Sequence, residues 1–345
     1  SGGPVGMINV NFIGDVDFYT GAFPANRGNM MSSLMEINLK DGRSDKLGGV
    51  FQVGASDIGI TLEGPLGPKT TFLASARRSY LQFLFAALQL PFLPTYNDFQ
   101  FKVKHSFNRK NQITVLGLGA IDNFSLNLNA NETPEQRFIL NYLPVNEQWN
   151  YSIGAKYTNF REHGYTNVVL SRFMLNNSAY KFANNNEDDV QLLDYQSQEI
   201  ENKLRVENFY KQKKLSLSGG FNFEEAKYYT TTLDKRFPNG LQLDYTSNLR
   251  LLKWGVFGNV SRTFYNRLDV SLGLRADAIN FNEEMGNLLN QLSPRVSASY
   301  NFTDALSLNA NWGIYYQLPP YTTLGFRNTA GELVNKDATY IKSEH

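Results

Sequence analysis

Strict alternation between apolar and polar residues dominates the chain after about residue 47. In the stretch 306–317, every second residue from Leu306 to Tyr316 is apolar, and most residues between them are polar or small. The same period of two runs through 149–160, 214–226, 268–278 and 295–302. Because successive side chains of a strand point to opposite faces, each stretch predicts a strand with one apolar and one polar face.

Short and long connections between these strands alternate along the chain. Tight turns are predicted at Asn108–Asn111, Asn266 and Thr303–Asp304. The opposite connections are predicted to be long, polar loops at 123–147, 176–200 and 281–292. This arrangement is typical of an up-and-down antiparallel meander, here with about 13 strands.

Two environments could hold strands of this kind. In a soluble β-sandwich the strands are usually about 5–6 residues long, and their apolar face meets a second sheet. The predicted strands are about 10–12 residues long, as a tilted strand needs in order to cross a bilayer. Aromatic residues gather near strand ends, for example Phe221 and Phe223, or Trp312 with Tyr315, as in the girdles of a membrane barrel. The pattern favours a transmembrane barrel, whose closed sheet satisfies every backbone group in lipid.

One apolar stretch does not alternate. Residues 80–94 ("YLQFLFAALQLPFLP") are too few for a membrane-spanning helix and contain Pro91 and Pro94. This stretch predicts either a short amphipathic helix or an interfacial loop, and the pattern favours a ligand pocket less than either of these.

Composition narrows the function classes. The 33 Lys and Arg nearly balance the 32 Asp and Glu, so no basic field indicates a nucleic-acid partner. The chain has no Cys, which excludes a disulfide scaffold and thiolate chemistry. His105, His163 and His345 share no metal-ligand spacing. Since no Ser/His/Asp set or carboxylate pair stands out either, we expect no enzyme and no cofactor.

The first forty residues carry a family resemblance. Residues 2–42 ("GGPVGMINVNFIGDVDFYTGAFPANRGNMMSSLMEINLKDG") resemble the C-terminal part of the plug domain of TonB-dependent outer-membrane receptors of the Bacteroidetes type. Val16, Phe18, Tyr19 and Gly21 match the family's first strand. Gly28 with Asn29 matches the turn, and "MEINLKDG" matches the exit into the barrel.

Three later motifs follow in the family's order. "IGITLEGPLGPKTTFLASARRSYL" (58–81) resembles the early hairpin, and "LSPRVSASYNFTDALSLNANWGIYYQLPPY" (292–321) resembles the late one. "DATYIKSEH" at the end resembles the start of a further strand. The resemblance implies an all-β fold: a transmembrane antiparallel up-and-down β-barrel, part of a 22-stranded barrel, with the C-terminal part of a plug at residues 1–45 and barrel at residues 46–345.

The chain departs from the family at two places. Related plugs commonly carry an aromatic residue where Arg27 stands. Arg27 could pair with a barrel-wall carboxylate and lock the plug, or it could be a solvated turn residue. The "IYG…NGV…TKKG" form of starch-utilisation receptors is absent, so a lid lipoprotein is not implied, although a surface lipoprotein or another outer-membrane subunit stays open as a partner.

The resemblance implies a location in the cell outer membrane, in contact with its lipid, and uptake of a scarce nutrient such as a siderophore, glycan or peptide. The TonB complex would pull on a segment upstream of residue 1, and the sequence is expected to be an internal fragment, since about 13 strands are fewer than 22. The alternatives are a receptor-like barrel that serves as a structural or binding subunit without transport, and a soluble β-rich binding protein.

Candidate site residues follow from the resemblance and the alternation. Gly21, Arg27 and Gly28 are the candidates for the plug turn and its contact with the barrel. On the polar face of the strands, the lumen-facing candidates are Glu224, Arg275, Asp277 and Arg295. These four could hold the plug, or they could be ordinary solvated lumen residues.

Overall fold

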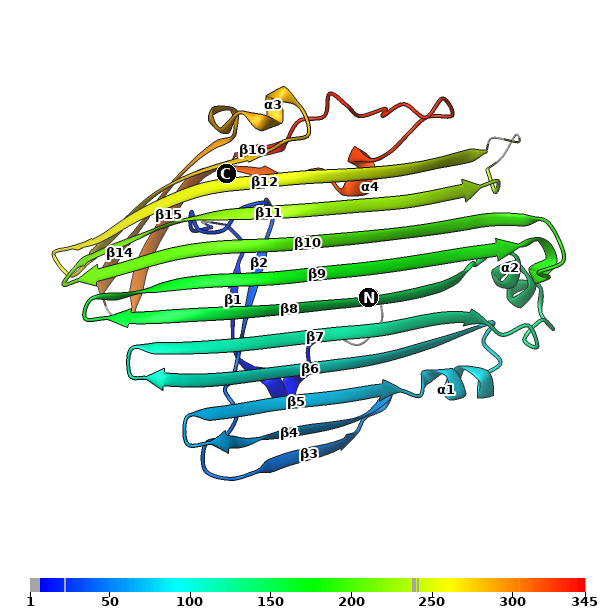
Figure 1. The fold of residues 1–345 in the computed structure, drawn as a ribbon, viewed down its shortest axis with the longest axis horizontal. Coiled ribbons are helices and arrows are strands. Elements are labelled where there is room, and N and C mark those ends of the chain that lie inside the picture. Colours follow the sequence, from blue (N-terminus) through cyan, green and yellow to red (C-terminus); the bar gives the residue numbers. More distant parts are fainter. Residues whose placement is uncertain (1–6, 22, 238–239, 241, 304, 345) are drawn as a thin grey trace.

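The protein, seen here as a computed structural model, consists of one large and one small antiparallel sheet (Figure 1). The structure describes residues 7–21, 23–237, 240, 242–303 and 305–344. The small sheet pairs β1 (Ile13–Tyr19) with β2 (Leu34–Leu39). The large sheet contains β3 (Gly48–Val53), β4 (Asp57–Gly67), β5 (Thr70–Ser79), β6 (Phe92–Asn108), β7 (Asn111–Leu126), β8 (Val145–Arg161), β9 (Gly164–Phe182), β10 (Gln191–Gln212), β11 (Leu215–Asp234), β12 (Leu243–Phe264), β13 (Leu268–Ile279), β14 (Leu292–Thr303), β15 (Leu306–Gln317) and β16 (Ile341–Glu344).

Short helical elements lie in the connections. They are η1 (Val10–Phe12), α1 (Leu81–Ala87), α2 (Pro134–Tyr142), η2 (Ala183–Asn185), α3 (Glu283–Gly286), η4 (Leu288–Gln291) and α4 (Tyr321–Leu324). None of the helices in the described part of the chain combines the length and the apolar character needed to cross a membrane.

Every strand of the large sheet pairs with its sequence neighbours, so the predicted up-and-down meander is confirmed. Within the described residues the sheet has 14 strands, one more than predicted. Tight turns join the strands at one end, which we call the turn end, at the left of Figure 1. There Tyr265 and Asn266 adopt φ of 52° and 58°, as a tight hairpin turn requires. The longer connections with α1 and α2 lie at the opposite end, which we call the loop end.

Two sequence-based predictions about strand length were wrong. β10 and β12 each have 22 residues, about twice the predicted length. The segment 176–200, predicted to be a loop, is mostly strand, because β9 continues to Phe182 and β10 begins at Gln191. Both faces of this part of the strands are polar, so hydrophobic alternation is lost there. The backbone hydrogen bonds that pair the strands do not depend on that alternation.

Three other connections agree with prediction in whole or in part. Residues 80–94 contain the short helix α1, one of the two structures expected for them, before β6 begins at Phe92. The predicted loop 123–147 is shorter than expected, since β7 ends at Leu126 and β8 begins at Val145. The loop 281–292 holds α3 and η4. Asp304, part of a predicted turn, lies outside the described residues.

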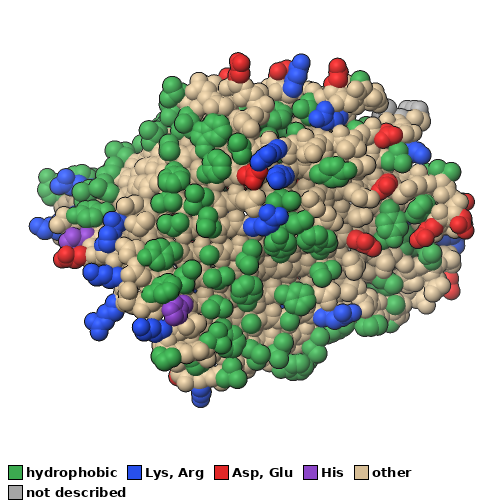
Figure 2. Space-filling view, in the orientation of Figure 1, with side chains coloured by type: hydrophobic (Ala, Val, Ile, Leu, Met, Phe, Trp, Pro, Cys, Tyr) green, Lys and Arg blue, Asp and Glu red, His purple; other side chains and the backbone are tan. Residues whose placement is uncertain are grey.

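The large sheet has two chemically different faces. The small sheet lies behind the large one in Figure 1, against what we call the inner face. On β13 the inner face carries Asp269, Ser271, Arg275 and Asp277, whereas Leu272 and Leu274 point outward and are half exposed. Figure 2 shows many apolar side chains spread over the outer face.

One glycine of the inner face illustrates how closely neighbouring strands approach. A Cβ on Gly220 would lie 2.1 Å from the carbonyl oxygen of Val206 and 2.7 Å from the ring of Phe257. In β12, Gly258 has no heavy atom within 4 Å of such a Cβ.

We therefore expect Gly220→Ala to destabilise the sheet by roughly 1–3 kcal/mol, because the backbone of β10 must move to accommodate the methyl group. Gly258→Ala is the matched control and should change stability by less than about 0.5 kcal/mol. Thermal unfolding of the detergent-solubilised protein measures both, and equal midpoints for the two variants would contradict the close approach.

Candidate functional site

The segment before β1 is anchored to the inner face of β4–β6. The Asn9 side-chain amide donates to Thr61 Oγ1 at 3.1 Å and to Ser75 Oγ at 2.7 Å. The Asn9 backbone N–H donates to Gln100 Oε1 at 3.2 Å. All four side chains are buried, so each polar group finds its partner across this contact.

A buried ion pair reinforces this first anchor. Arg77 Nε lies 3.0 Å from Asp98 Oδ1, and both side chains are less than 10% exposed, at 7% and 4%. Arg77 Nη2 donates to the Met7 carbonyl at 3.0 Å, and Gln100 Nε2 donates to the same oxygen. The inner face of the large sheet therefore presents a cation, Arg77, that is paired with Asp98 and also holds the backbone of Met7.

The loop between β1 and β2 is anchored to the opposite part of the inner face by Arg295. Arg295 Nη1 donates to the carbonyls of Phe23 (3.0 Å), Pro24 (2.6 Å) and Arg27 (2.7 Å). Its guanidinium carbon lies 4.8 Å from the ring centre of Tyr315, which in turn makes an edge contact with Phe23. Among the described ion pairs none includes Arg295, so carbonyl dipoles and the ring face stabilise this buried cation.

Arg275 makes the second contact of this anchor. Its guanidinium is held by Asp277 at 2.5 and 2.6 Å and by Asn222 at 2.9 Å, and it reaches the Ala25 carbonyl at 3.4 Å. A Cβ on Gly28 would lie 2.2 Å from Arg275 Nε. Glycine at position 28 is thus what allows the loop to approach the guanidinium.

Arg27, in the loop between β1 and β2, forms an ion pair with Glu36 of the small sheet. Its guanidinium donates to both carboxylate oxygens of Glu36 in β2, one of them at 2.9 Å. The ion pair that the structure shows for Arg27 therefore lies within the hairpin, and the Arg27 carbonyl accepts a hydrogen bond from Arg295 of the large sheet. The wall carboxylate nearby, Glu207, accepts from Asn26 at 2.8 Å instead. Gly21 lies just beyond β1, which ends at Tyr19.

A third contact forms where the chain leaves β2. Asp41 lies 2.8 Å from Lys102 Nζ and 2.5 Å from Lys104 Nζ, near the turn end of β6. Partial burial raises the pKa of Asp41, but the two ammonium groups outweigh that effect and hold the pKa below its usual range. Lys102 also donates to the carbonyls of Leu39 and Lys40.

Next to the Arg275 anchor, the inner face carries a compact charge cluster. Glu224 pairs with Lys203 at 3.3 Å and also with Lys253, and both lysines also pair with Glu201, at 2.6 and 3.1 Å. Tyr321 of α4 donates to Glu201 Oε1 at 2.5 Å and accepts from Lys253 Nζ. Burial and the adjacent carboxylate raise the pKa of Tyr321, so its hydroxyl stays protonated at physiological pH.

The long connection after β15 covers this charge cluster. Leu318 and Leu324 are buried with Tyr228 and Met285 in an apolar core above β11–β13. The Leu318 backbone N–H donates to Asn29 Oδ1 at 2.6 Å, so the same connection touches the loop between β1 and β2. A cavity of about 370 Å³ lies between that loop and the wall, lined among others by Asn26, Gly28, Lys203, Lys253 and Tyr340.

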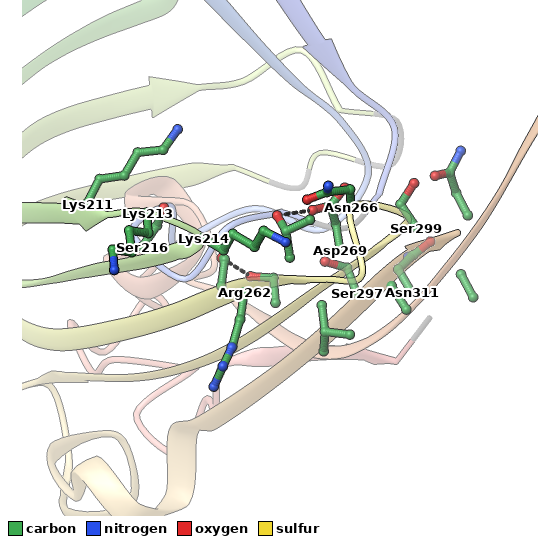
Figure 3. Close-up of a pocket in the computed structure, with 17 residues that line it drawn as sticks. Lys211, Lys213, Lys214, Ser216, Arg262, Asn266, Asp269, Ser297, Ser299 and Asn311 are labelled. Atoms are coloured by element: carbon green, nitrogen blue, oxygen red, sulfur yellow. Dashed lines mark hydrogen bonds between the residues drawn. The ribbon is translucent and has the colours of Figure 1, made fainter. Parts of the chain in front are cut away.

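Two larger cavities lie along the inner face. One, of about 690 Å³, is lined by Ile37, Asn38 and Leu39 of β2 and by β6–β10. The other, of about 720 Å³, lies at the turn end of β10–β15 (Figure 3). Its lining includes Lys211, Lys214 and the pair Thr263–Asp269, which are joined by a hydrogen bond of 2.5 Å. Only the first of these two cavities is lined by residues of the small sheet, and both linings mix polar and apolar side chains.

In the parts of the chain that the structure describes, no group of three or more His, Asp or Glu side chains is arranged to hold a metal ion. The site is thus a set of polar anchors between a small hairpin and the inner face of the large sheet, with cavities of mixed lining along that face.

Residues 71–343 match the family model described as TonB dependent receptor-like, beta-barrel. The chain belongs to this family. It is a family of receptors and not a class of enzymes. In its terms the large sheet is barrel wall and its inner face is lumen. We propose that the small sheet is part of the plug, and we call the loop between β1 and β2 the plug loop.

Solved structures of the same fold agree with this assignment. The ferric enterobactin receptor PfeA of Pseudomonas aeruginosa is 14% identical, with a TM-score of 0.67 over 94% of this chain and 51% of its own. The siderophore receptor PirA of Acinetobacter baumannii is 12% identical, with a TM-score of 0.68 over 91% and 49%. The copper transporter OprC is 11% identical, with a TM-score of 0.65 over 90% and 52%. The chain spans about half the length of these structures, and none of the curated proteins matches it.

The lumen-facing candidates from the sequence all lie on the inner face, and Arg275, Asp277 and Arg295 lie together at the plug loop. Glu224 lies in the adjacent charge cluster. Sequence reasoning missed Glu201, Lys203, Lys253 and Tyr321, although alternation alone places the first three on the polar face. The roles of Asn9 and Arg77 could not be predicted from the neighbouring sequence, because their partners are distant along the chain.

Gly28→Ala is expected to loosen the plug loop, because the new methyl group displaces a guanidinium held by Asp277 and Asn222. The cost should be roughly 1–3 kcal/mol. Faster hydrogen–deuterium exchange of residues 13–39 would report it. Gly21→Ala is the control, since its Cβ would meet only Asn311 Nδ2 at an ordinary 3.6 Å. Unchanged hydrogen–deuterium exchange in Gly28→Ala would contradict the prediction, because it would show that the Arg275 side chain moves aside without a measurable cost.

Asp41→Asn should weaken the third contact in a pH-dependent way. Because the folded-state pKa of Asp41 lies below its unfolded value of 3.8, its contribution is fully present above that pH and is lost as the pH falls through the folded pKa. The stability difference between the natural protein and Asp41→Asn should therefore be constant at neutral pH and vanish in strong acid. Denaturant titrations across this range measure it, and a difference that persists in strong acid would exclude the carboxylate as its source.

Proposed function

We propose that the chain is part of an active outer-membrane transporter, in which a nutrient passes through the barrel when the plug moves. The observation that carries this proposal is the plug loop itself. Arg275 and Arg295 hold it through backbone carbonyls, and the contact lies inside a barrel of the TonB-dependent family. Such contacts can be replaced by water one at a time.

The proposal includes the division of the chain. Residues 1–45 form the C-terminal part of a plug of the Bacteroidetes type, and residues 46–345 form part of a 22-stranded barrel; β2 ends at Leu39 and β3 begins at Gly48. A barrel of that size has a lumen too wide to stay closed without a plug. The segment that contacts TonB would lie upstream of residue 1, and the barrel would lie in the outer membrane.

The ligand is proposed to be a scarce nutrient. The structural neighbours are receptors for ferric enterobactin and siderophores and a copper transporter, which favours a chelated or free metal over a glycan or peptide. The cavity of about 370 Å³ between the plug loop and the charge cluster is the proposed contact of the plug with ligand.

The test locks the plug to the wall. The Ala25 Cβ lies 2.9 Å from a Cβ placed on Gly273, close enough for a disulfide after a small shift, and residues 1–345 contain no Cys that could compete for it. In the receptor at its full natural length, Ala25→Cys with Gly273→Cys should abolish energised uptake when oxidised and regain it on reduction. The probes are radiolabelled ferric enterobactin and Cu(II), together with growth of cells limited in iron or copper.

The single variants Ala25→Cys and Gly273→Cys control for the substitutions and should respond to neither oxidant nor reductant. Uptake that continues with the plug crosslinked would contradict plug movement. A receptor whose deletion changes neither uptake nor growth on any limited nutrient would instead favour the non-transporting structural subunit.

A further inference from the structure

Along β8–β12, the outward side chains change from mostly apolar to mostly polar at one distance from the turn end. From the turn end, outward side chains are mostly apolar for roughly ten residues, the length of a tilted strand that crosses a bilayer. On β11 these include Leu217, Phe221 and Phe223, each at least 40% exposed. Beyond that level most outward residues are polar or charged, with Trp149, Met174 and Ile200 as apolar exceptions. The first polar residues on each strand at this level are Tyr151, Arg172, Asn202, Glu225 and Arg250.

Strand register places these residues side by side. Arg172 pairs with Asn202, and Asn202 pairs with Glu225. Arg250 pairs with Lys227, the next outward residue after Glu225 on β11. We call Arg172, Asn202, Glu225, Lys227 and Arg250 the outer basic cluster. Figure 2 shows basic side chains and an acidic one gathered among apolar side chains on this face.

The charges of the outer basic cluster do not balance. Arg172 is held by neutral groups, with Nε 3.0 Å from Tyr151 Oη and Nη1 2.9 Å from Asn202 Oδ1. Arg250 lies 2.7 Å and Lys227 3.8 Å from the one carboxylate, Glu225. Three cations and one anion leave a net charge of +2. The side chains of Arg250 and Lys227 are 71% and 50% exposed, so they can take a further partner.

The position of the cluster along the strands indicates which kind of partner it binds. Trp149 and Tyr151 stack beside it, and such aromatic residues mark the membrane–water interface. Cationic side chains on the lipid-facing side are costly in hydrocarbon but not at the interface. The cluster extends over three strand spacings, about 14 Å, which is wider than one phosphate group. Arginine and lysine pair strongly with phosphate oxygens.

We infer that the outer basic cluster binds the phosphate groups of lipid headgroups in the membrane leaflet at the loop end. The inference rests on the proposed membrane location but not on transport. Arg172 and Arg250 contact separate phosphates, on one bisphosphorylated headgroup or on two neighbouring ones, and Lys227 lies between them. Glu225 limits the affinity, because it competes with the phosphates for Arg250 and Lys227.

The test measures lipid retention by native mass spectrometry on the purified receptor at its full natural length. The probes are diphosphoryl lipid A and phosphatidic acid, with phosphatidylcholine as the neutral lipid and inorganic phosphate as the competitor. Arg172→Gln/Lys227→Gln/Arg250→Gln should reduce retention of both phosphate lipids at least tenfold. Lys110→Gln/Lys213→Gln/Lys214→Gln removes the same charge from exposed turn-end positions and should leave retention unchanged.

Glu225→Gln separates binding from structural support. It removes the competing carboxylate and should tighten phosphate-lipid retention several-fold, whereas a purely structural role predicts no gain. Arg250→Gln, which loses only its contact with Glu225, gives a well-folded variant if the triple substitution does not fold.

Three results would overturn the inference: equal losses in the cluster and turn-end variants, equal retention of phosphatidylcholine, or displacement of lipid by inorganic phosphate. The proposed function fails separately, through the crosslinking experiment. A receptor that stays soluble without detergent and retains no lipid would contradict the membrane location itself.

Discussion

The position of the loop between β1 and β2 depends on two buried guanidinium groups. Backbone carbonyls of the loop satisfy Arg295, whereas Asp277 and Asn222 hold Arg275 in place to reach the loop. Arg295 donates to the carbonyls of residues 23, 24 and 27, and Arg275 reaches that of residue 25. A buried cation without partners is strongly unfavourable, so the loop and these arginines stabilise each other. Carbonyls are weaker partners than carboxylates, and water can take their place. The contact is therefore specific when closed and still reversible.

The small sheet gains its order from the wall. A two-stranded hairpin alone is marginally stable in water. Here it is held at residues 7–12 by Asn9 and its partners, at the loop by Arg275 and Arg295, and at the exit by Asp41. The Arg27–Glu36 pair braces the hairpin internally. The hairpin is thus braced within itself and held to the large sheet by separate polar contacts.

The long strands pass through several environments, and their side chains change accordingly. Inner-face residues of β10–β13 meet cavities and the loop between β1 and β2, and ion pairs such as Glu201–Lys253 form there. Outward residues near the turn end, such as Phe221 and Phe223, are apolar, whereas the charged residues Glu225 and Arg250 follow closer to the loop end. The backbone ladder is the same throughout, which is why alternation underestimated the strand lengths.

The sequence by itself determined the all-β class, the meander and the inner-face position of Arg275, Asp277, Arg295 and Glu224, because strand alternation is a local property of the chain. It also indicated Gly28 as a turn residue of the plug. Only the tertiary structure decided that Arg27 pairs with Glu36, that Gly28 makes room for Arg275, and that Tyr321 joins Glu201 and Lys253. These contacts join residues 9 to 247 positions apart, and partner choice at such separations follows from sheet register and curvature, which no local pattern encodes.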